Sequence, residues 1–234
     1  PLTLERLFQN LADKDYSTKT IRDVYNILNS MFKYAIHNRL IAFNPCAGVC
    51  LPKTKTKEIR VLTVEEQKEV VAHARGRLYE NLILVALGTG MRGGEMLGLT
   101  WDDVDFENRE CIVLGKGSKE RPVYFDARTK IHLHNYIMSR TDDNPALFVS
   151  LLAPYNRLEI SGVEIRLRKL GRKLNIPKVH PHKFRRTLAT RAIDKGMPIE
   201  QLQQLLGHTK IDTTMEYAMV NQNNVKQSHR KYIG

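Results

Sequence analysis

The sequence predicts a mainly α-helical fold with a small antiparallel β-sheet, an α+β class. In several segments apolar residues recur with the 3.6-residue period of an amphipathic helix. One stretch, CIVLGKGSKERPVYF, has the composition of two β-strands around a glycine-rich turn at residues 115–118. The 234 residues are 42% hydrophobic and 26% charged, which is typical of a folded chain with one large domain or two smaller ones.

The N-terminal segment, residues 2–43, is predicted to be helical. Ser17 or Thr18 can cap the start of its second helix. The two apolar stripes comprise Leu4, Leu7, Phe8 and Leu11, and then Ile21, Val24, Tyr25, Leu28, Met31, Phe32 and Ala35. Residues 46–60 lack periodicity and contain KTKTK, which predicts a linker. Because the helical segment 1–45 is small and residue 1 is not Met, we expect it to be part of a larger helical domain.

The second region, residues 61–220, is predicted to form the larger domain. Thr63 and Glu66 have capping-box spacing, and the apolar run 80–87 predicts a buried helix. Further along, a helix at 163–174 separates an apolar face from a basic one. The apolar face carries Val163, Leu167, Leu170 and Leu174, and the basic face carries Arg166, Lys169, Arg172 and Lys173. Residues 221–234 are expected to form a tail that either frays or packs on a neighbouring protomer.

The charge distribution favours a polyanionic partner. The net charge is +12 and the isoelectric point is about 9.7. Between Glu164 and Lys195, eleven Lys and Arg accompany two acidic residues, so a surplus of +9 lies in one segment. Such a cluster is often only a solvated face, but in so basic a chain it favours nucleic acid. No apolar run approaches the roughly 20 residues of a membrane span. The odd count of three cysteines, Cys46, Cys50 and Cys111, favours a reducing cytosol. Cys46 and Cys50 are expected to be small buried residues, because their neighbourhood lacks further metal ligands.

Four short stretches carry residues suited to chemistry, although each has an ordinary structural explanation by itself. In GTGMRGGEM, Arg92 lies among glycines and Glu95 follows three residues later, so the carboxylate can hold the guanidinium or form a surface ion pair. In LGKGSKERPVYF, Lys116 lies on the hairpin turn, where it is either solvated or swings into a neighbouring site as a proton donor. The GKG sequence lacks the strand and helix of a P-loop, so we reject that alternative.

The third stretch is HPHKFRRTLATRA. If a helix begins near Pro181, His182 and Arg185 both extend from its start, where the helix dipole favours an anion such as phosphate. His180 and His182 could suggest a metal, but no carboxylate or third histidine has a useful spacing, which argues against a metal site.

The fourth stretch is LLGHTKIDTTMEYAMV. Gly207 is predicted to end a helix, and His208 follows in the turn. Thr213 and Thr214 precede a short helical stretch that carries Tyr217. A tyrosine in such a place usually packs or forms a hydrogen bond, and it acts as a nucleophile only in suitable company.

Taken together, the four stretches supply a set suited to phosphoryl transfer. Two Arg, one Lys and two His can bind a phosphodiester and stabilise the negative charge that grows on its oxygens. The remaining requirement is a nucleophile, and Tyr217 can supply one because cations or an imidazole can share the proton of its phenol.

The chain resembles the tyrosine recombinases, the phage-integrase family. The resemblance rests on an ordered set without a departure from the family pattern: Arg92, Lys116, His182-x-x-Arg185, His208 and Tyr217. It covers most of residues 61–220 and is carried by TGMRGGEMLGLTWDDVDF, HPHKFRRTLAT and LLGHTKIDTTMEYAMV. The segment NRLIAFNPCAGVCLPK resembles the end of the family's core-binding domain and its linker, so 1–45 would be a partial core-binding domain and 61–220 the catalytic domain.

The resemblance also implies a mechanism. Tyr217 would attack the scissile phosphate to form a 3′-phosphotyrosyl link, and Lys116 would protonate the leaving 5′-hydroxyl. Arg92 and Arg185 would stabilise the non-bridging oxygens.

Supporting roles follow for the other residues. His208 would donate a hydrogen bond, His182 would assist proton transfer at the tyrosine, and Glu95 would hold Arg92. No cofactor or metal is implied, because the phosphotyrosine ester conserves the energy of the broken bond.

The implied partners are duplex DNA and further copies of the chain. Four protomers would act on two DNA sites through a Holliday junction, in the cytoplasm of a bacterium and associated with the nucleoid. The candidate DNA-binding residues are Arg166, Lys169, Arg172, Lys173, Arg186 and Arg191.

The biological role stays open between alternatives. The phrase DTTMEYAMV favours integration or excision of a mobile element, with which an accessory excision factor could act. The alternatives are a Xer-like resolvase of chromosome or plasmid dimers, a regulator that binds DNA without activity, and a type IB topoisomerase that shares the chemistry.

Overall fold

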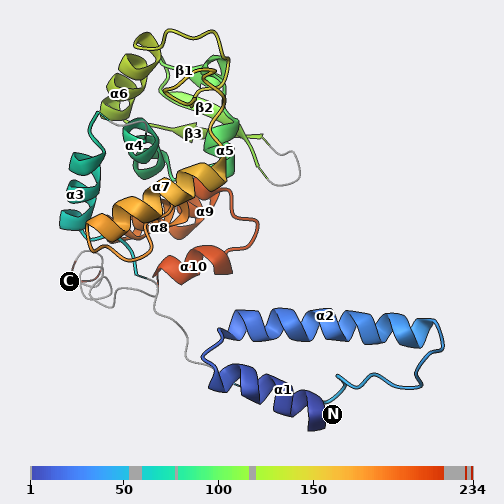
Figure 1. Ribbon diagram of the computed structural model, residues 1–234. Helices are drawn as coiled ribbons and strands as arrows, with labels where there is room; N and C mark the ends of the chain where they lie inside the picture. Colours follow the sequence, from blue (N-terminus) through green and yellow to red (C-terminus); the bar gives the residue numbers. More distant parts are fainter. Residues whose placement is uncertain are drawn as a thin grey trace. The chain divides into compact units, whose positions relative to one another are not determined.

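The chain divides into two compact units, Pro1–Ile59 and Arg60–Gly234. The computed structural model describes residues 2–52, 60–76, 79–115 and 120–218, together with residues 230 and 233 (Figure 1). The predicted fold class is confirmed, since these residues form mostly helices and a three-stranded antiparallel sheet. None of the helices in this part of the chain is both long and apolar enough to span a membrane.

The first unit contains two helices, α1 (Leu2–Asp13) and α2 (Thr18–His37). The predicted cap is confirmed, because the Ser17 side chain accepts a hydrogen bond from the backbone N–H of the third residue after it, at 3.1 Å. Phe8 and Ile21 are buried, and the rings of Phe8 and Tyr25 lie 6.0 Å apart between centroids. Met31, predicted to belong to the apolar stripe, is instead 51% exposed, because the stripe is wider than the surface that α1 covers.

Residues after α2 pack onto this unit. The Asn44 side-chain amide donates to Asn29 at 2.8 Å, and the Asn44 side-chain oxygen accepts from the backbone N–H of Cys46 at 2.9 Å. Cys46 is buried there, as predicted, and Cys111 is buried in the second unit. Cys50 was also predicted to be buried, but it is exposed.

The helices of the second unit fall where the sequence patterns indicate. Its described elements are α3 (Val64–Ala74), α4 (Glu80–Thr89), α5 (Gly93–Gly98), the 3₁₀ helix η1 (Trp101–Asp103), β1 (Val104–Asp105), β2 (Glu110–Leu114), β3 (Glu120–Tyr124), α6 (Ala127–Met138), α7 (Ile160–Lys173), α8 (Pro181–Asp194), α9 (Ile199–Leu206) and α10 (Asp212–Ala218). The capping box of Thr63 and Glu66 is present, and Pro181 occupies the first turn of α8.

One helix boundary differs from the prediction. Thr213 and Thr214 lie within α10 rather than before it. The reason is local: the carbonyl of Ile211 accepts hydrogen bonds from the backbone N–H groups of Thr214 and Met215, at 2.7 and 2.9 Å, so the first turn starts earlier.

The small sheet has the strand order β1-β2-β3, and both pairings are antiparallel. The predicted hairpin is confirmed in β2 and β3, where Leu114 pairs with Glu120 next to the turn. Residues 116–119 of that turn lie outside the described residues. Strand β1 was not predicted, because two residues are too few to display the alternation of a strand.

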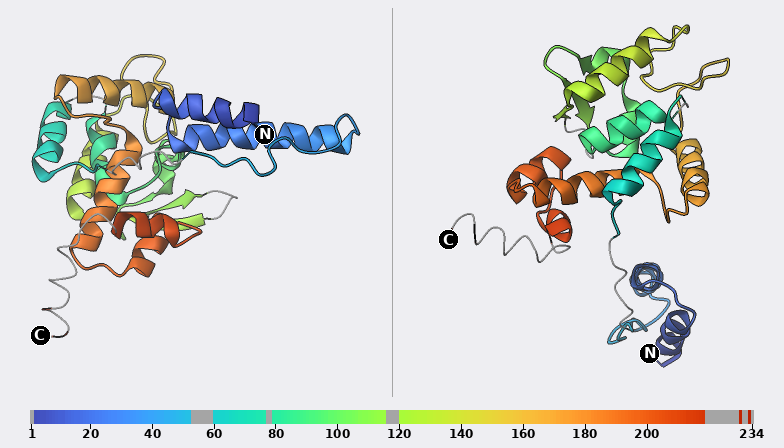
Figure 2. Two further views of the ribbon diagram at one scale, coloured as in Figure 1. Left: turned by 90° about the horizontal axis from the view of Figure 1, so that it is seen from below. Right: turned by 90° about the vertical axis from the view of Figure 1, so that its left-hand side faces the viewer.

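The core of the second unit surrounds α4. Residues 82–86 of this helix are all buried, which confirms the predicted buried helix. Helix α4 contacts α6 and α8, and Figures 1 and 2 show it near the middle of the unit, with α6 and the sheet on one side and α8 on the other. A second apolar cluster holds the C-terminal helices together through Ala189, Leu202, Leu206 and Tyr217. These two clusters bring α5, α8, α9 and α10 together around one site.

Candidate active site

Arg92 and Glu95 lie at the start of the short helix α5. Gly90 ends α4 in the left-handed conformation (φ 66°), and the chain then turns so that Arg92 precedes the first residue of α5. Glu95 accepts hydrogen bonds from the Arg92 side chain (Nη1 to Oε1, 2.6 Å) and from its backbone N–H (2.8 Å). The predicted pairing is therefore confirmed, and it is more than a surface contact, because the Glu95 side chain is only 5% exposed.

Arg185 extends from α8 and is almost completely buried, at 1% exposed. Its Nη1 donates to the carbonyl of Gly90 at 2.7 Å, and its Nη2 donates to the carbonyl of Leu206. Burial, and then repulsion by Arg92, lowers the pKa of Arg185 to about 10, so it remains a cation at neutral pH. Its Nε has no hydrogen-bond partner among the described residues.

Arg121 of β3 is a further member of this group, and sequence reasoning missed it. Its Nη2 donates to Glu95 Oε2 at 2.8 Å, and its Nη1 donates to the carbonyl of Leu205 at 2.8 Å. A sequence signal existed: Arg121 shares its strand face with the buried Val123, where a charge is costly without a partner.

The two imidazoles of the predicted set lie among these cations. His208 follows the end of α9, and its Nδ1 is 2.8 Å from the hydroxyl of Thr214, which is fully buried. Burial, and then the charges of Arg185 and Arg92, lower the pKa of His208 to about 4. His208 is therefore neutral at pH 7 in the free protein, and the negative charge of a bound phosphate would act to raise its pKa.

His182 lies in the first turn of α8. Its pKa is also lowered to about 4, first by desolvation and then by repulsion from Arg186 and Arg185. The ring stacks on that of His180, with centroids 6.4 Å apart. In the part of the chain that the structure describes, no three side chains gather as ligands for a metal ion.

Tyr217 lies on α10, beside His208. The two ring centroids are 6.0 Å apart, and the Tyr217 side chain packs among residues of α8 and α9 with 3% exposure. The negative charge of an ionised phenol at this position would raise the pKa of Arg185, which shows that the two side chains are within electrostatic range. Of the predicted set, Arg92, His182, Arg185, His208 and Tyr217 thus lie close together, from three of the four stretches.

The position of Lys116 lies outside the described residues. The described residues that flank this turn, Gly115 and Glu120, line a cavity of about 700 Å³. Arg92, Arg121 and His208 line the same cavity, so the hairpin that carries Lys116 begins and ends at the site.

The site as a whole is suited to an anion. Arg92, Arg121 and Arg185 are close enough to repel one another, and Glu95 is the carboxylate that pairs with two of them. Burial acts to raise the pKa of Glu95, but hydrogen bonds from Arg92 and the charges of both arginines outweigh it and lower that pKa. A phosphate would relieve the remaining repulsion and receive several charge-assisted hydrogen bonds.

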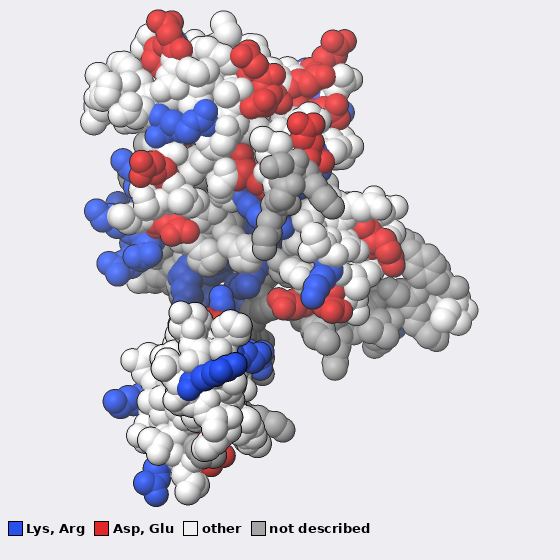
Figure 3. Space-filling model, turned by 90° about the vertical axis from the view of Figure 1, so that its right-hand side faces the viewer, with Lys and Arg blue, Asp and Glu red and all other residues white. Residues whose placement is uncertain are grey.

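The predicted basic face of α7 is present. Arg166, Lys169, Arg172 and Lys173 are all exposed. Of the apolar face, Val163, Leu167 and Leu170 are buried, and Leu174, which caps the helix, is half-buried. Figure 3 shows Lys and Arg side chains gathered in one band of the second unit, while Asp and Glu are most frequent toward the top of that view.

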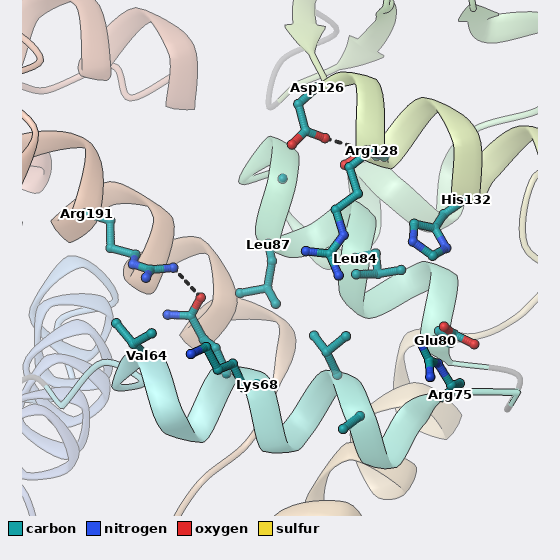
Figure 4. A pocket seen from close by; sticks show the side chains of 15 residues that line it. Val64, Lys68, Arg75, Glu80, Leu84, Leu87, Asp126, Arg128, His132 and Arg191 are labelled. Carbon is teal, nitrogen blue, oxygen red and sulfur yellow. Dashed lines mark hydrogen bonds between the residues drawn. The ribbon is translucent and has the colours of Figure 1, made fainter.

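The other two candidate DNA-binding residues lie on α8. Arg186 is half-buried and close enough to His182 to lower its pKa. Arg191 reaches toward α3, where its Nη1 donates to Gln67 at 2.6 Å (Figure 4). It also lines a cavity of about 610 Å³, together with Lys68 and other residues of α3, α4 and α6.

Comparison with known proteins places the chain in a family. The model of the phage integrase family matches residues 57–224. Tyrosine recombinase XerA of Pyrococcus furiosus is 33% identical over 228 residues, which cover 95% of this chain and 77% of that protein. Tyrosine recombinase XerC of Pediococcus pentosaceus is 32% identical over 239 residues, covering 95% and 78%.

The fold comparison agrees. The structure of the Tn1549 transposon integrase in complex with transposon right end DNA has a TM-score of 0.80 and 23% identity, and the match covers 99% of this chain and 84% of that one. The chain therefore belongs to the phage integrase family of tyrosine recombinases, enzymes that break and rejoin DNA.

Proposed function

We propose that the chain is a site-specific recombinase in which Tyr217 is the nucleophile. Its phenolic oxygen forms a bond to the scissile phosphorus, and the bond from phosphorus to the 5′-oxygen breaks. Lys116 protonates the departing 5′-oxygen, so the step leaves a 3′-phosphotyrosyl link and a free 5′-hydroxyl. The observation that supports this assignment is the position of Tyr217 beside His208 and within electrostatic range of Arg185.

The cations act on the charge that develops in the transition state. Arg92 and Arg185 bind the non-bridging oxygens, and Glu95 keeps the Arg92 guanidinium in place. His208 donates a hydrogen bond to the same phosphate, and its contact with Thr214 sets the orientation of its ring.

His182 takes the proton of the Tyr217 phenol in this mechanism. The imidazole is neutral in the free protein, because partial desolvation and neighbouring arginines lower its pKa to about 4, although the residue is exposed. Binding of the DNA phosphate raises that pKa toward the range of a useful general base.

The reaction is reversible because the phosphotyrosine ester replaces one phosphodiester with another. A 5′-hydroxyl from a second DNA strand attacks the ester and restores the phenol, so no ATP is consumed. Two such exchanges, on two DNA sites held by four protomers, pass through a Holliday junction. The exposed basic residues of α7 contact the DNA backbone, whereas the contact of Arg191 with Gln67 favours a structural role for that residue.

A DNA substrate that is nicked next to the cleavage site tests the nucleophile, because the short strand diffuses away and traps the covalent adduct. Tyr217→Phe should abolish the adduct and leave DNA binding unchanged. Tyr124→Phe is the matched control, since Tyr124 is an exposed tyrosine that lines the same cavity as Arg92 and His208. It should form the adduct at the normal rate. A Tyr217→Phe protein that still links to DNA would show that another residue attacks.

Two biological roles use this same chemistry. Xer-type relatives at 33% and 32% identity favour resolution of DNA dimers. Insertion or excision of a mobile element is favoured by the likeness to the Tn1549 transposon integrase.

Mapping of the DNA that becomes linked to the chain in cells distinguishes the two roles. One fixed chromosomal or plasmid site is expected for a resolvase, and the two ends of an element are expected for an integrase.

A further inference from the structure

Three arginines from different elements meet at the end of helix α9. Its last carbonyl groups have no partner within the helix, as at every helix C-terminus. The carbonyl of Leu205 accepts from Arg121 at 2.8 Å, and the carbonyl of Gly207 accepts from Arg92 at 3.1 Å. Between them, the carbonyl of Leu206 accepts from Arg185.

We propose that Arg121 is a positioning residue for DNA cleavage. It holds Arg92 through the shared carboxylate of Glu95, and it holds the end of α9 from which His208 extends. The inference rests on the proposed function, in which Arg92 and His208 act on the scissile phosphate.

The first contact of Arg121 is with Glu95. One carboxylate oxygen, Oε1, binds Arg92 at 2.6 Å, and the other, Oε2, binds Arg121 at 2.8 Å. The Glu95 side chain is 5% exposed and that of Arg121 is 13% exposed, so little water competes for either bond. Because each oxygen has its own guanidinium, the carboxylate cannot rotate without breaking an ion pair. The backbone N–H of Arg92 donates to the same Oε2 at 2.8 Å, so Arg121 and this N–H together define the orientation in which Glu95 presents its other oxygen to the Arg92 side chain.

The second contact is with α9. Arg121 donates to Leu205, and the partial negative charge of the helix C-terminus adds to this attraction. The approach is close: a Cβ atom added to Gly207 would lie 2.6 Å from the Arg121 Nε. Since Gly207 directly precedes His208, Arg121 constrains the point from which the imidazole enters the site.

Arg121 already donates from both of its terminal nitrogens to groups of the protein, Glu95 and the carbonyl of Leu205. Its Nε is buried and has no hydrogen-bond partner among the described residues. We therefore assign its effect on cleavage to the groups that it holds, which defines the experiment.

The test measures single-turnover formation of the covalent adduct at saturating DNA. Arg121→Gln should slow this step on the order of 10- to 100-fold, because a displacement of about 1 Å in a reacting group has an effect of that size. DNA affinity should stay within about two-fold. Arg121→Lys should recover part of the rate, since it keeps a charge for Glu95 but loses the two-pronged geometry.

A double-mutant cycle with Arg92 distinguishes positioning from a general loss of structure. In an Arg92→Lys background, Arg121→Gln should slow the step less than it does in the native protein, because Arg92 is already impaired and only the effect through α9 and His208 remains. An equal slowing in both backgrounds would overturn the proposal.

Arg157→Gln is the matched control. Arg157 also donates to two carbonyls, those of Leu97 and Leu99 at 2.6 and 3.0 Å, at the opposite end of α5 from Arg92. Arg157→Gln and Arg121→Gln should both lower the melting temperature. At temperatures where the protein is folded, Arg157→Gln should leave the cleavage rate unchanged. Equal slowing by both variants would show a merely structural effect. If Arg121→Gln does not fold, the cycle is run with Arg121→Lys, and a normal rate for that variant would overturn the proposal.

The proposed function and this inference fail separately. An adduct formed by the Tyr217→Phe protein would refute the nucleophile, whereas the rates of the Arg121 variants report only on positioning.

Discussion

Arg92 and Arg185 bear the same charge in one site but lie in different surroundings. The Arg92 side chain is 40% exposed and pairs with Glu95, whereas Arg185 is 1% exposed and binds two carbonyl oxygens. A residue at the surface of the site can change with little effect on folding. A buried residue cannot, because its partners lose hydrogen bonds that water does not replace.

We therefore expect lysine substitutions at the two positions to have different consequences. Each should slow adduct formation about 100- to 1,000-fold, because the planar fork of the guanidinium is lost. Arg185→Lys should also lower the free energy of unfolding by about 1–3 kcal/mol, while Arg92→Lys should have a smaller effect. Urea denaturation and single-turnover kinetics on both variants measure this. Equal stability losses would contradict the distinction.

The histidines provide a prediction about pH. The pKa of the half-buried His208 is lowered from 6.5 to about 4, first by burial and then by neighbouring arginines. The pKa of His182 is lowered as well, but this residue is exposed, so solvent screening reduces its contribution to stability. At a pH between the unfolded-state pKa of 6.5 and the folded-state pKa of about 4, the unfolded chain binds more protons than the folded one. The free energy of unfolding therefore falls as the pH drops from 6.5 toward 4.

Urea midpoints at pH 7 and pH 5.5 should show this loss, and they avoid the range in which ordinary carboxylates titrate. His208→Asn should reduce the difference between the two midpoints. His132→Asn, which removes a half-exposed imidazole on α6, should retain it. If His208→Asn shows the full pH dependence, the depressed pKa of His208 does not contribute.

Among the elements, the end of α9 has the greatest influence on the site. Gly207 adopts φ 62°, and its hydrogen atom occupies space that a side chain would take from Arg121. The helix therefore needs glycine here for two independent reasons, one of backbone conformation and one of packing.

Gly207→Ala should destabilise the protein by more than the roughly 1–2 kcal/mol that left-handed backbone alone costs, and it should slow cleavage. Gly196→Ala is the control, because Gly196 also has a positive φ, of 89°, just after a helix, but an added Cβ would meet nothing within 4 Å. Thermal denaturation gives the loss of stability in each variant, and the difference between the two losses measures the clash with Arg121. Equal losses would mean that Arg121 moves away at no cost.

In the molecule as a whole, charge is concentrated where the site needs it. The chain has a net charge of +12, and the exposed basic residues of α7 belong to the segment with a surplus of +9. Binding to DNA releases counterions, so the logarithm of the association constant falls linearly with the logarithm of salt concentration.

Replacement of Arg166 and Lys169 by Gln should reduce the slope of this salt dependence by about 2, one unit for each phosphate contact. The control replaces Lys68 and Arg128, two exposed basic residues beside the cavity of Figure 4, and changes the net charge by the same amount. The salt dependence of DNA binding by this control variant should have the same slope as that of the native protein. Equal slopes for the two double variants would show that α7 does not contact DNA.

Local interactions made several features readable from the sequence. The caps of α2 and α3, the β2–β3 hairpin and the pairing of Arg92 with Glu95 each depend on residues within a few positions of one another, or on a turn that joins adjacent strands. The order of the six predicted catalytic residues could likewise be predicted, because the resemblance to the family rests on short sequence motifs. The position of Lys116 was predicted too, but it stays a prediction.

By itself, then, the sequence determined the fold class, several of the helices, the β2–β3 hairpin and the family chemistry of this protein. Only the tertiary structure decided that Arg121 and Arg92 bind the end of α9, across 84 and 115 residues of chain. No local pattern encodes such a contact, because the unpaired carbonyls of a helix end can be satisfied by any donor that packing brings near. Which donor arrives depends on how the apolar cores place β3, α5 and α9.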